Sequence, residues 1–174
     1  MRFEELSYEV REAARNVRLL LLDCDGVLTD GRLYFSASGE ELKVFDVQDG
    51  LGIVSWVRSG NVVGIVSGRE SAIVTQRAAE LGIQIVRQHV KDKLQTAQEI
   101  WAELAIEPHE TAFVGDDLPD VELIKAVGFG VAVANAVDEV KAAADHITPR
   151  EGGGGAVREV IELLMQAKAS TDQN

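Results

Sequence analysis

Residues 17–30 read VRLLLLDCDGVLTD, an apolar run that is followed at once by two aspartates and a glycine. A continuous apolar run of this length is typical of a strand buried on both faces of a parallel sheet. Open α/β sheets bind their ligands beyond the carboxyl ends of such strands. Because Asp23 and Asp25 come directly after the run, this stretch predicts both the sheet and the place of an active site.

The two aspartates also predict a bound cation. Two unit charges about 4 Å apart repel by roughly 4 kcal/mol at an effective dielectric constant near 20. Magnesium is typically held by one or two carboxylates together with a phosphorylated substrate, although manganese and cobalt tolerate similar oxygen ligands. An Asp-x-Asp-Gly segment by itself also fits an Asx turn after a strand. The cation prediction therefore depends on partners elsewhere in the chain.

Composition limits the class of protein. With 174 residues, of which 46% are hydrophobic, the chain fits a single domain over residues 1–174. A net charge of -12 argues against a nucleic-acid partner. The longest apolar runs are only as long as a strand, which predicts that no segment spans a membrane. We expect an N-terminal helix over residues 1–16 rather than a signal peptide. The single cysteine, Cys24, is expected to be a small buried residue, and it fits a reducing, cytoplasmic location.

Strand and helix patterns alternate along most of the chain. A β-hairpin is expected over residues 32–46, with strands at 32–35 and 41–46 around a turn with glycine. The other expected strands are 17–22, 62–66, 83–86, 111–114, 130–134 and 146–147, and the expected helices are 49–59, 70–81, 91–104, 118–126 and 137–144. This alternation predicts a doubly wound α/β fold with a parallel sheet and helices on both faces.

The C-terminal part, residues 152–174, begins with four glycines, Gly152–Gly155. The run fits either a hinge or a close approach of the backbone to a phosphate or a neighbouring subunit, and both interpretations stay open. A last amphipathic helix is expected over residues 156–168, followed by a polar tail that we expect to be frayed.

Polar residues follow two further expected strands. Ser67-Gly68-Arg69 follows residues 62–66, and Gly115-Asp116-Asp117 follows residues 111–114, while Lys91 or Lys93 begins the helix between them. In a parallel sheet these strand ends share one edge. Acids, a hydroxyl group and an ammonium group at one edge suit phosphoryl transfer, which needs a nucleophile, a metal and donors for the phosphoryl oxygens.

At this point the chain resembles the haloacid dehalogenase superfamily over roughly residues 17–165. Four motifs occur in order: Asp23-Cys24-Asp25-Gly26, Ser67 after an apolar strand, Lys93, and Gly115-Asp116-Asp117-Leu118-Pro119-Asp120. The resemblance implies a phosphatase in which Asp23 is the nucleophile that forms an aspartyl-phosphate. Asp25 would protonate the leaving oxygen and then activate water, while Ser67 and Lys93 would bind the phosphoryl oxygens.

The resemblance also implies a magnesium site. Its ligands would be the side chain of Asp23, the backbone carbonyl of Asp25 and Asp116, with Asp117 and Asp120 orienting the inner groups. Simpler roles stay open for three residues. Ser67 could only cap the next helix, Asp120 could be an ordinary acid in a first helical turn, and Lys91 is expected to be a solvated surface charge.

Superfamily members commonly carry a cap domain, for which this chain has no room, so the resemblance is to the capless group. Within it the chain is similar to phosphatases of 3-deoxy-D-manno-octulosonate 8-phosphate, a lipopolysaccharide sugar phosphate. This implies a cytoplasmic homotetramer in which hairpins pack together and each subunit covers a neighbour's site. The implied substrate contacts are Asp25, Asp46, Val47, Gln48, Asp49, Gly50, Arg69, Arg77 and Lys93.

Two residues depart from that pattern, since Gln48 and Val54 stand where basic residues are expected. Fewer positive charges should weaken recognition of an anionic sugar, for which Arg158 of a neighbour could compensate. A nine-carbon ulosonate phosphate therefore stays an alternative substrate. The alternatives to an enzyme are a receiver-type signalling module or a non-catalytic sugar-binding relative, and turnover of a phosphate ester separates them.

Overall fold

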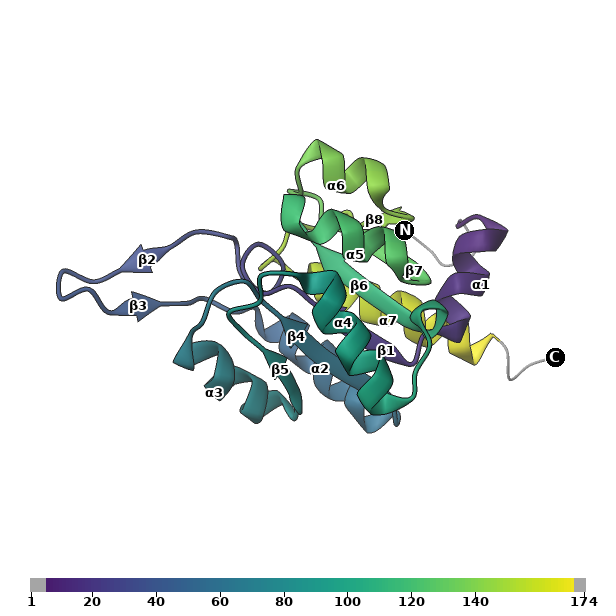
Figure 1. Cartoon of the computed structure of the whole chain (residues 1–174), viewed down its shortest axis with the longest axis horizontal. Coiled ribbons are helices and arrows are strands. Elements are labelled where there is room, and N and C mark those ends of the chain that lie inside the picture. Colours follow the sequence, from purple (N-terminus) through teal and green to yellow (C-terminus); the bar gives the residue numbers. More distant parts are fainter. Residues whose placement is uncertain (1–5, 171–174) are drawn as a thin grey trace.

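The computed structural model describes residues 6–170 and contains a six-stranded parallel sheet with helices on both faces (Figure 1). The strand order is β5-β4-β1-β6-β7-β8, and every pairing between neighbours in this sheet is parallel. The doubly wound α/β prediction is confirmed. In the described part of the chain, no helix is long and apolar enough to cross a bilayer.

Strand β1, Leu19–Leu22, lies in the middle of the sheet and is buried along its whole length. It pairs with β4, Val62–Val66, and with β6, Thr111–Gly115. The registers are level, because Leu19 is opposite both Val62 and Thr111. The three strands therefore end side by side, which brings the residues after them to one edge of the sheet.

The helices form two layers. Helices α1, α7 and α2 cover one face, with α3 beside α2, and α4, α5 and α6 cover the other face (Figure 1). The bounds are α1 Tyr8–Asn16, α2 Val47–Arg58, α3 Ala72–Leu81, β5 Ile85–Arg87, α4 Lys93–Leu104, η2 Pro108–Glu110, η3 Leu118–Asp120, α5 Val121–Ala126, β7 Phe129–Ala132, α6 Asp138–Ala143, β8 His146–Ile147 and α7 Ala156–Ala169.

Several helices begin elsewhere than the sequence pattern indicates, because local side chains cap them. Asp46 accepts a hydrogen bond from the backbone N–H of Gln48, so α2 begins two residues earlier than expected. Asp92 caps α4 through the N–H of Gln95, which moves the start of that helix to Lys93. The helix expected over residues 118–126 begins as the 3₁₀ turn η3.

The predicted hairpin is present and projects from the body of the molecule (Figure 1). Its strands, β2 (Tyr34–Phe35) and β3 (Glu41–Leu42), are shorter than predicted. Apolar side chains stay exposed on it and just beyond it: Leu33, Phe35, Leu42 and Val44. A two-stranded ribbon with no third strand or helix packed on it is only marginally stable in water, which explains why its strands are short.

The glycine run is packed against the loop that follows β1. A Cβ on Gly152 would lie 1.7 Å from the carbonyl oxygen of Gly26, and the N–H of Gly153 donates to the carbonyl of Val27 over 3.0 Å. The hinge interpretation is therefore wrong: the close approach is to the loop that follows β1 in the same chain. The expected N-terminal helix is described from Tyr8, and residues 1–5 and 171–174 lie outside the described part.

Candidate active site

The ends of β1, β4 and β6 meet at a cleft of about 430 Å³. Asp23 follows β1, Ser67 follows β4 and Asp116 follows β6, and all three line the cleft together with Asp25 and Lys93. The volume lies within the usual range for small-molecule sites. The sequence prediction that these strand ends share one site is thus confirmed in space.

Lys93 links two buried acids at the base of the cleft. Its Nζ lies 2.9 Å from Oδ1 of Asp23 and 2.5 Å from Oδ1 of Asp120, and all three residues are buried. Burial lowers the pKa of Lys93, but the charges of Asp23 and Asp120 outweigh that effect and raise it. The lysine therefore stays an ammonium ion that can neutralise a phosphoryl group beside Asp23.

Asp116 and Asp23 form a pair of neighbouring carboxyl groups. Burial, and then the charge of Asp23, raises the pKa of Asp116 to about 8. Burial also raises the pKa of Asp23 to about 6, against the opposing effect of Lys93. A Cβ at Gly26 would lie 2.0 Å from Oδ2 of Asp116, so only glycine there leaves room for this carboxyl group.

These carboxyl groups fit a hard divalent cation. Oxygens of Asp23, Asp116 and Asp120 lie within 4.8 Å of one another, and Oδ1 of Asp116 is buried without a hydrogen-bond partner among the described residues. A cation between Asp23 and Asp116 would satisfy that oxygen and remove their mutual repulsion.

Asp120 has its oxygens occupied already. Oδ1 binds Lys93, and Oδ2 accepts the backbone N–H groups of Asp116 over 2.9 Å and Asp117 over 3.2 Å. Asp120 is thus an acid in the first turn of η3, as the simpler interpretation held, and it also holds Lys93 and the backbone at Asp116 in place. Asp117 itself is exposed, and its side chain accepts the N–H of Leu118 at the start of η3.

Ser67 and Lys91 can now be placed. Ser67 is buried and lines the cleft, whereas α3 begins at Ala72 after Ser71, so the helix-capping interpretation of Ser67 is wrong. Lys91 is exposed at the rim of the cleft, as its interpretation as a solvated charge requires.

Cys24 lies between the two aspartates and is completely buried. Burial raises the pKa of its thiol to about 12, which leaves it protonated and unreactive. The interpretation as a small buried residue is confirmed.

Sequence reasoning missed two charged residues of the hairpin, Lys43 and Glu41, that form ion pairs with residues of the cleft. Lys43 forms an ion pair with Oδ1 of Asp25, and Glu41 binds Arg69 over 2.9 Å. Arg69 lies 3.5 Å from Oδ2 of Asp25. A signal existed, because charged residues two apart on a strand point to the same face.

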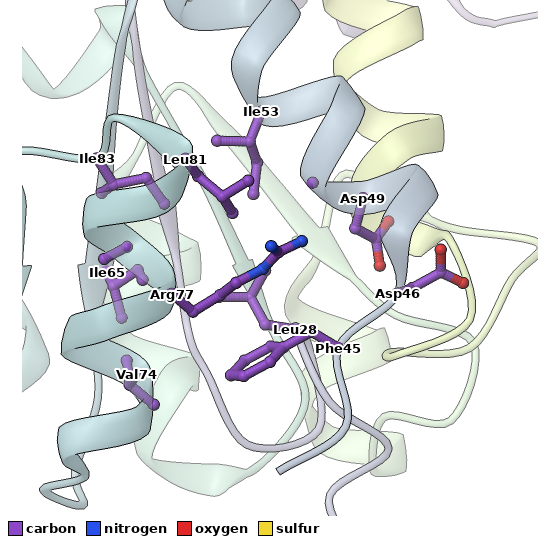
Figure 2. Close-up of a pocket in the computed structure, with 12 residues that line it drawn as sticks. Leu28, Phe45, Asp46, Asp49, Ile53, Ile65, Val74, Arg77, Leu81 and Ile83 are labelled. Carbon is purple, nitrogen blue, oxygen red and sulfur yellow. The ribbon is translucent and has the colours of Figure 1, made fainter.

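The remaining predicted substrate contacts lie elsewhere. Asp46, Asp49, Gly50 and Arg77 line a second cavity between α2 and α3, where the Arg77 side chain reaches from α3 toward the start of α2 (Figure 2). This cavity, of about 10 Å³, has room for about one water molecule. Within one chain these residues are therefore not part of the catalytic cleft.

The N-terminal turn of α2 shows two further contacts. Val47 and Gln48 are exposed, and the side-chain oxygen of Gln48 accepts a hydrogen bond from Arg150 over 2.8 Å. Asp49 is buried and accepts the backbone N–H of Arg158 over 2.7 Å, so it caps the start of α7.

The chain was compared with known proteins. Residues 65–161 match the family model described as haloacid dehalogenase-like hydrolase. The chain is 44% identical over 168 residues to the 3-deoxy-D-manno-octulosonate 8-phosphate phosphatase of Escherichia coli strain K12, which covers 97% of this chain and 89% of that protein.

Two solved structures are also similar. The phosphatase of the same name from Moraxella catarrhalis, in complex with magnesium, phosphate and KDO, superposes with a TM-score of 0.91 at 41% identity and covers 95% of each chain. The cobalt-bound form of the Haemophilus influenzae deoxy-D-mannose-octulosonate 8-phosphate phosphatase gives a TM-score of 0.87 at 37% identity, over 90% of this chain and 92% of that one. These similarities leave the receiver-type and binding-module alternatives without support. The chain belongs to the haloacid dehalogenase-like hydrolase family.

Proposed function

We propose that this protein is a magnesium-dependent phosphatase of 3-deoxy-D-manno-octulosonate 8-phosphate that works through an aspartyl-phosphate. The observation that carries the proposal is the buried carboxylate of Asp23, held between the ammonium of Lys93 and the carboxyl group of Asp116 at the base of an open cleft. A carboxylate with a cationic partner and a fitting metal site is equipped to attack a phosphorus atom.

In the first half of the reaction, a carboxylate oxygen of Asp23 forms a bond to phosphorus while the bond from phosphorus to the sugar oxygen breaks. Asp25 gives its proton to that leaving oxygen, because an alkoxide is a poor leaving group. Lys93 and the hydroxyl of Ser67 face the same cleft and bind the phosphoryl oxygens.

In the second half, water attacks the phosphorus of the aspartyl-phosphate. Asp25, now ionised, takes a proton from the water as the bond between phosphorus and Asp23 breaks. Free phosphate leaves, and both aspartates return to their starting states.

For the metal we propose the side chains of Asp23 and Asp116 and the backbone carbonyl of Asp25 as ligands. The unpartnered Oδ1 of Asp116 and the raised pKa of both carboxyl groups support this assignment. When bound, magnesium neutralises charge that develops on the transferred phosphoryl group. Asp120 orients Lys93 and the backbone at Asp116, and Asp117 stabilises the turn beside it.

The eight-carbon substrate is proposed from the similar proteins, whose names carry that sugar phosphate. Arg69 supports an anionic sugar, because its guanidinium lines the cleft next to Asp25. Gln48 stands where a basic residue is expected, and its side-chain oxygen accepts a hydrogen bond from the guanidinium of Arg150. Arg158, the other candidate for a compensating charge, binds Glu162 of its own helix.

We further propose a cytoplasmic homotetramer that serves lipopolysaccharide synthesis. The exposed apolar side chains of the hairpin support self-association, because their burial between subunits would remove apolar surface from water. Light scattering tests this assembly.

The experiment is phosphate release by the purified protein with magnesium, across octulosonate 8-phosphate and nine-carbon ulosonate 9-phosphates. Preference for the octulosonate, abolished in Asp23→Asn, is the expected result. Preference for a nine-carbon ester would replace the substrate, and no release from any ester would overturn the phosphatase proposal.

A further inference from the structure

The hairpin does more than project from the sheet, because its returning arm reaches the active site. Four charged side chains form a closed ring there: Asp25 of the catalytic loop, Lys43 and Glu41 of the hairpin, and Arg69 after β4. Each acid contacts both bases, so every charge in the ring is compensated within it. A second bond fixes Glu41, whose other oxygen accepts the hydroxyl of Ser71 over 2.8 Å.

Lys43 has an unusual environment for a lysine on a projecting ribbon. Its side chain is only 4% exposed, although the apolar residues on either side of it in sequence are exposed. An ammonium group is strongly hydrated, so its burial is stable only beside anions, and here these are Asp25 and Glu41. The residue does not line the cleft, so it contacts the site through Asp25.

The two oxygens of Asp25 are held differently. Oδ1 is paired with Lys43 beneath the hairpin, while Oδ2 is 3.5 Å from Arg69, which lines the cleft. Fixing one oxygen of a carboxyl group removes its rotation and directs the other toward the substrate side. General acid catalysis depends on such placement within hydrogen-bond reach of the leaving oxygen.

We propose that Lys43, held by Glu41, is a positioning residue that orients Asp25 so that Oδ2 exchanges the proton with the leaving oxygen. The inference rests on the proposed phosphatase function, and it makes the hairpin part of the catalytic apparatus as well as a surface. In this step Oδ2, left free of Lys43, takes up a proton from water as the phosphate ester enters the cleft. That proton moves to the sugar oxygen as the bond from this oxygen to phosphorus breaks and Asp23 bonds to phosphorus.

The test compares two substrates in Lys43→Met. An alkyl phosphate, octulosonate 8-phosphate, needs the proton from Asp25, whereas 4-nitrophenyl phosphate has a stable leaving group and needs it little. The value of kcat/KM covers the steps up to departure of the leaving group. We expect it to fall about 10- to 100-fold for the sugar phosphate, part of the 10²- to 10⁴-fold that acid catalysis supplies, and less than about 3-fold for the aryl phosphate.

Three further variants complete the test. Lys43→Arg keeps a cation next to Asp25 and should recover most of the loss, and Glu41→Gln should give the same selective loss at smaller size. Glu41→Gln also serves if Lys43→Met fails to fold, which thermal unfolding would reveal. Glu40→Gln is the matched control, because Glu40 is exposed, accepts a bond from Ser38 and stands outside the ring.

An equal loss for both substrates in Lys43→Met and Glu41→Gln, or no loss for either, would overturn the inference while leaving the phosphatase intact. If the unmodified protein releases phosphate from neither compound, the proposed function fails and the inference fails with it.

Discussion

Removing the charge of Asp49 should change how stability depends on pH. Asp49 is 2% exposed and caps the start of α7 through the N–H of Arg158. Burial raises the pKa of its carboxyl group from the usual 3.8 to about 6, although backbone hydrogen bonds from Arg158 and Gly155 oppose the rise. The acid is thus neutral in the folded chain at a pH where the unfolded chain has already ionised it.

The sign follows from linkage. A raised pKa means that the folded state binds more protons, so the stability that Asp49 contributes is complete below about pH 3.8 and is lost as the pH rises to about 6. Two pKa units correspond to roughly 3 kcal/mol, of which about 2 kcal/mol falls between pH 4 and pH 7. Asp49→Asn keeps an oxygen that can accept the same hydrogen bond and has no charge to titrate.

The assay is urea unfolding of both proteins at several pH values, at one protein concentration. We expect the free energy of unfolding of the natural protein to fall by about 2 kcal/mol relative to Asp49→Asn between pH 4 and pH 7, with an unchanged denaturant slope. Parallel pH profiles for the two proteins would refute the assignment of a buried, titrating carboxyl group to this cap.

Three more predictions concern the site itself. Magnesium should raise the midpoint of thermal unfolding, relative to the protein with chelator, more at pH 8 than at pH 5.5. The pKa of Asp116 is raised to about 8, so at pH 5.5 its carboxyl group is protonated and magnesium must displace that proton. Equal shifts of the midpoint at both pH values would contradict this. Gly152→Ala should lower the free energy of unfolding by about 2 kcal/mol or more in urea, whereas Gly154→Ala, whose added Cβ would meet its nearest atom at 3.3 Å, should cost less than about 1 kcal/mol. Lys93→Met should reduce kcat at least about 100-fold in a phosphate-release assay. The control is Lys125→Met, which removes an exposed lysine, and equal kcat values for the two variants would argue against the role given to Lys93.

Much of the fold was predictable from local sequence. The apolar run before Asp23 identified the central strand, and the alternation of strand and helix patterns identified a parallel sheet. Because parallel strands end at one edge, the sequence order of Asp23, Ser67 and Asp116 was enough to predict that they meet. Helix starts were less predictable, since a single capping side chain such as Asp46 moves them by two residues.

The contacts between distant segments could not be predicted in the same way. Nothing local indicates that Lys43 pairs with Asp25, because that pairing depends on the path of the hairpin over the site. Likewise, only the three-dimensional structure shows that the predicted substrate contacts on α2 line a different cavity from the catalytic cleft.

The sequence by itself therefore determined the sheet and the acids that meet at the strand ends, because periodicity and strand direction are properties of short segments. The reaction class came from the residue types in the four motifs and from the family that they resemble. Only the tertiary structure decided which oxygen of each carboxyl group has a partner, why Gly152 must lack a side chain, and how the hairpin reaches Asp25. These features arise from close packing between segments far apart in the chain, where a displacement of one ångström makes or breaks a contact.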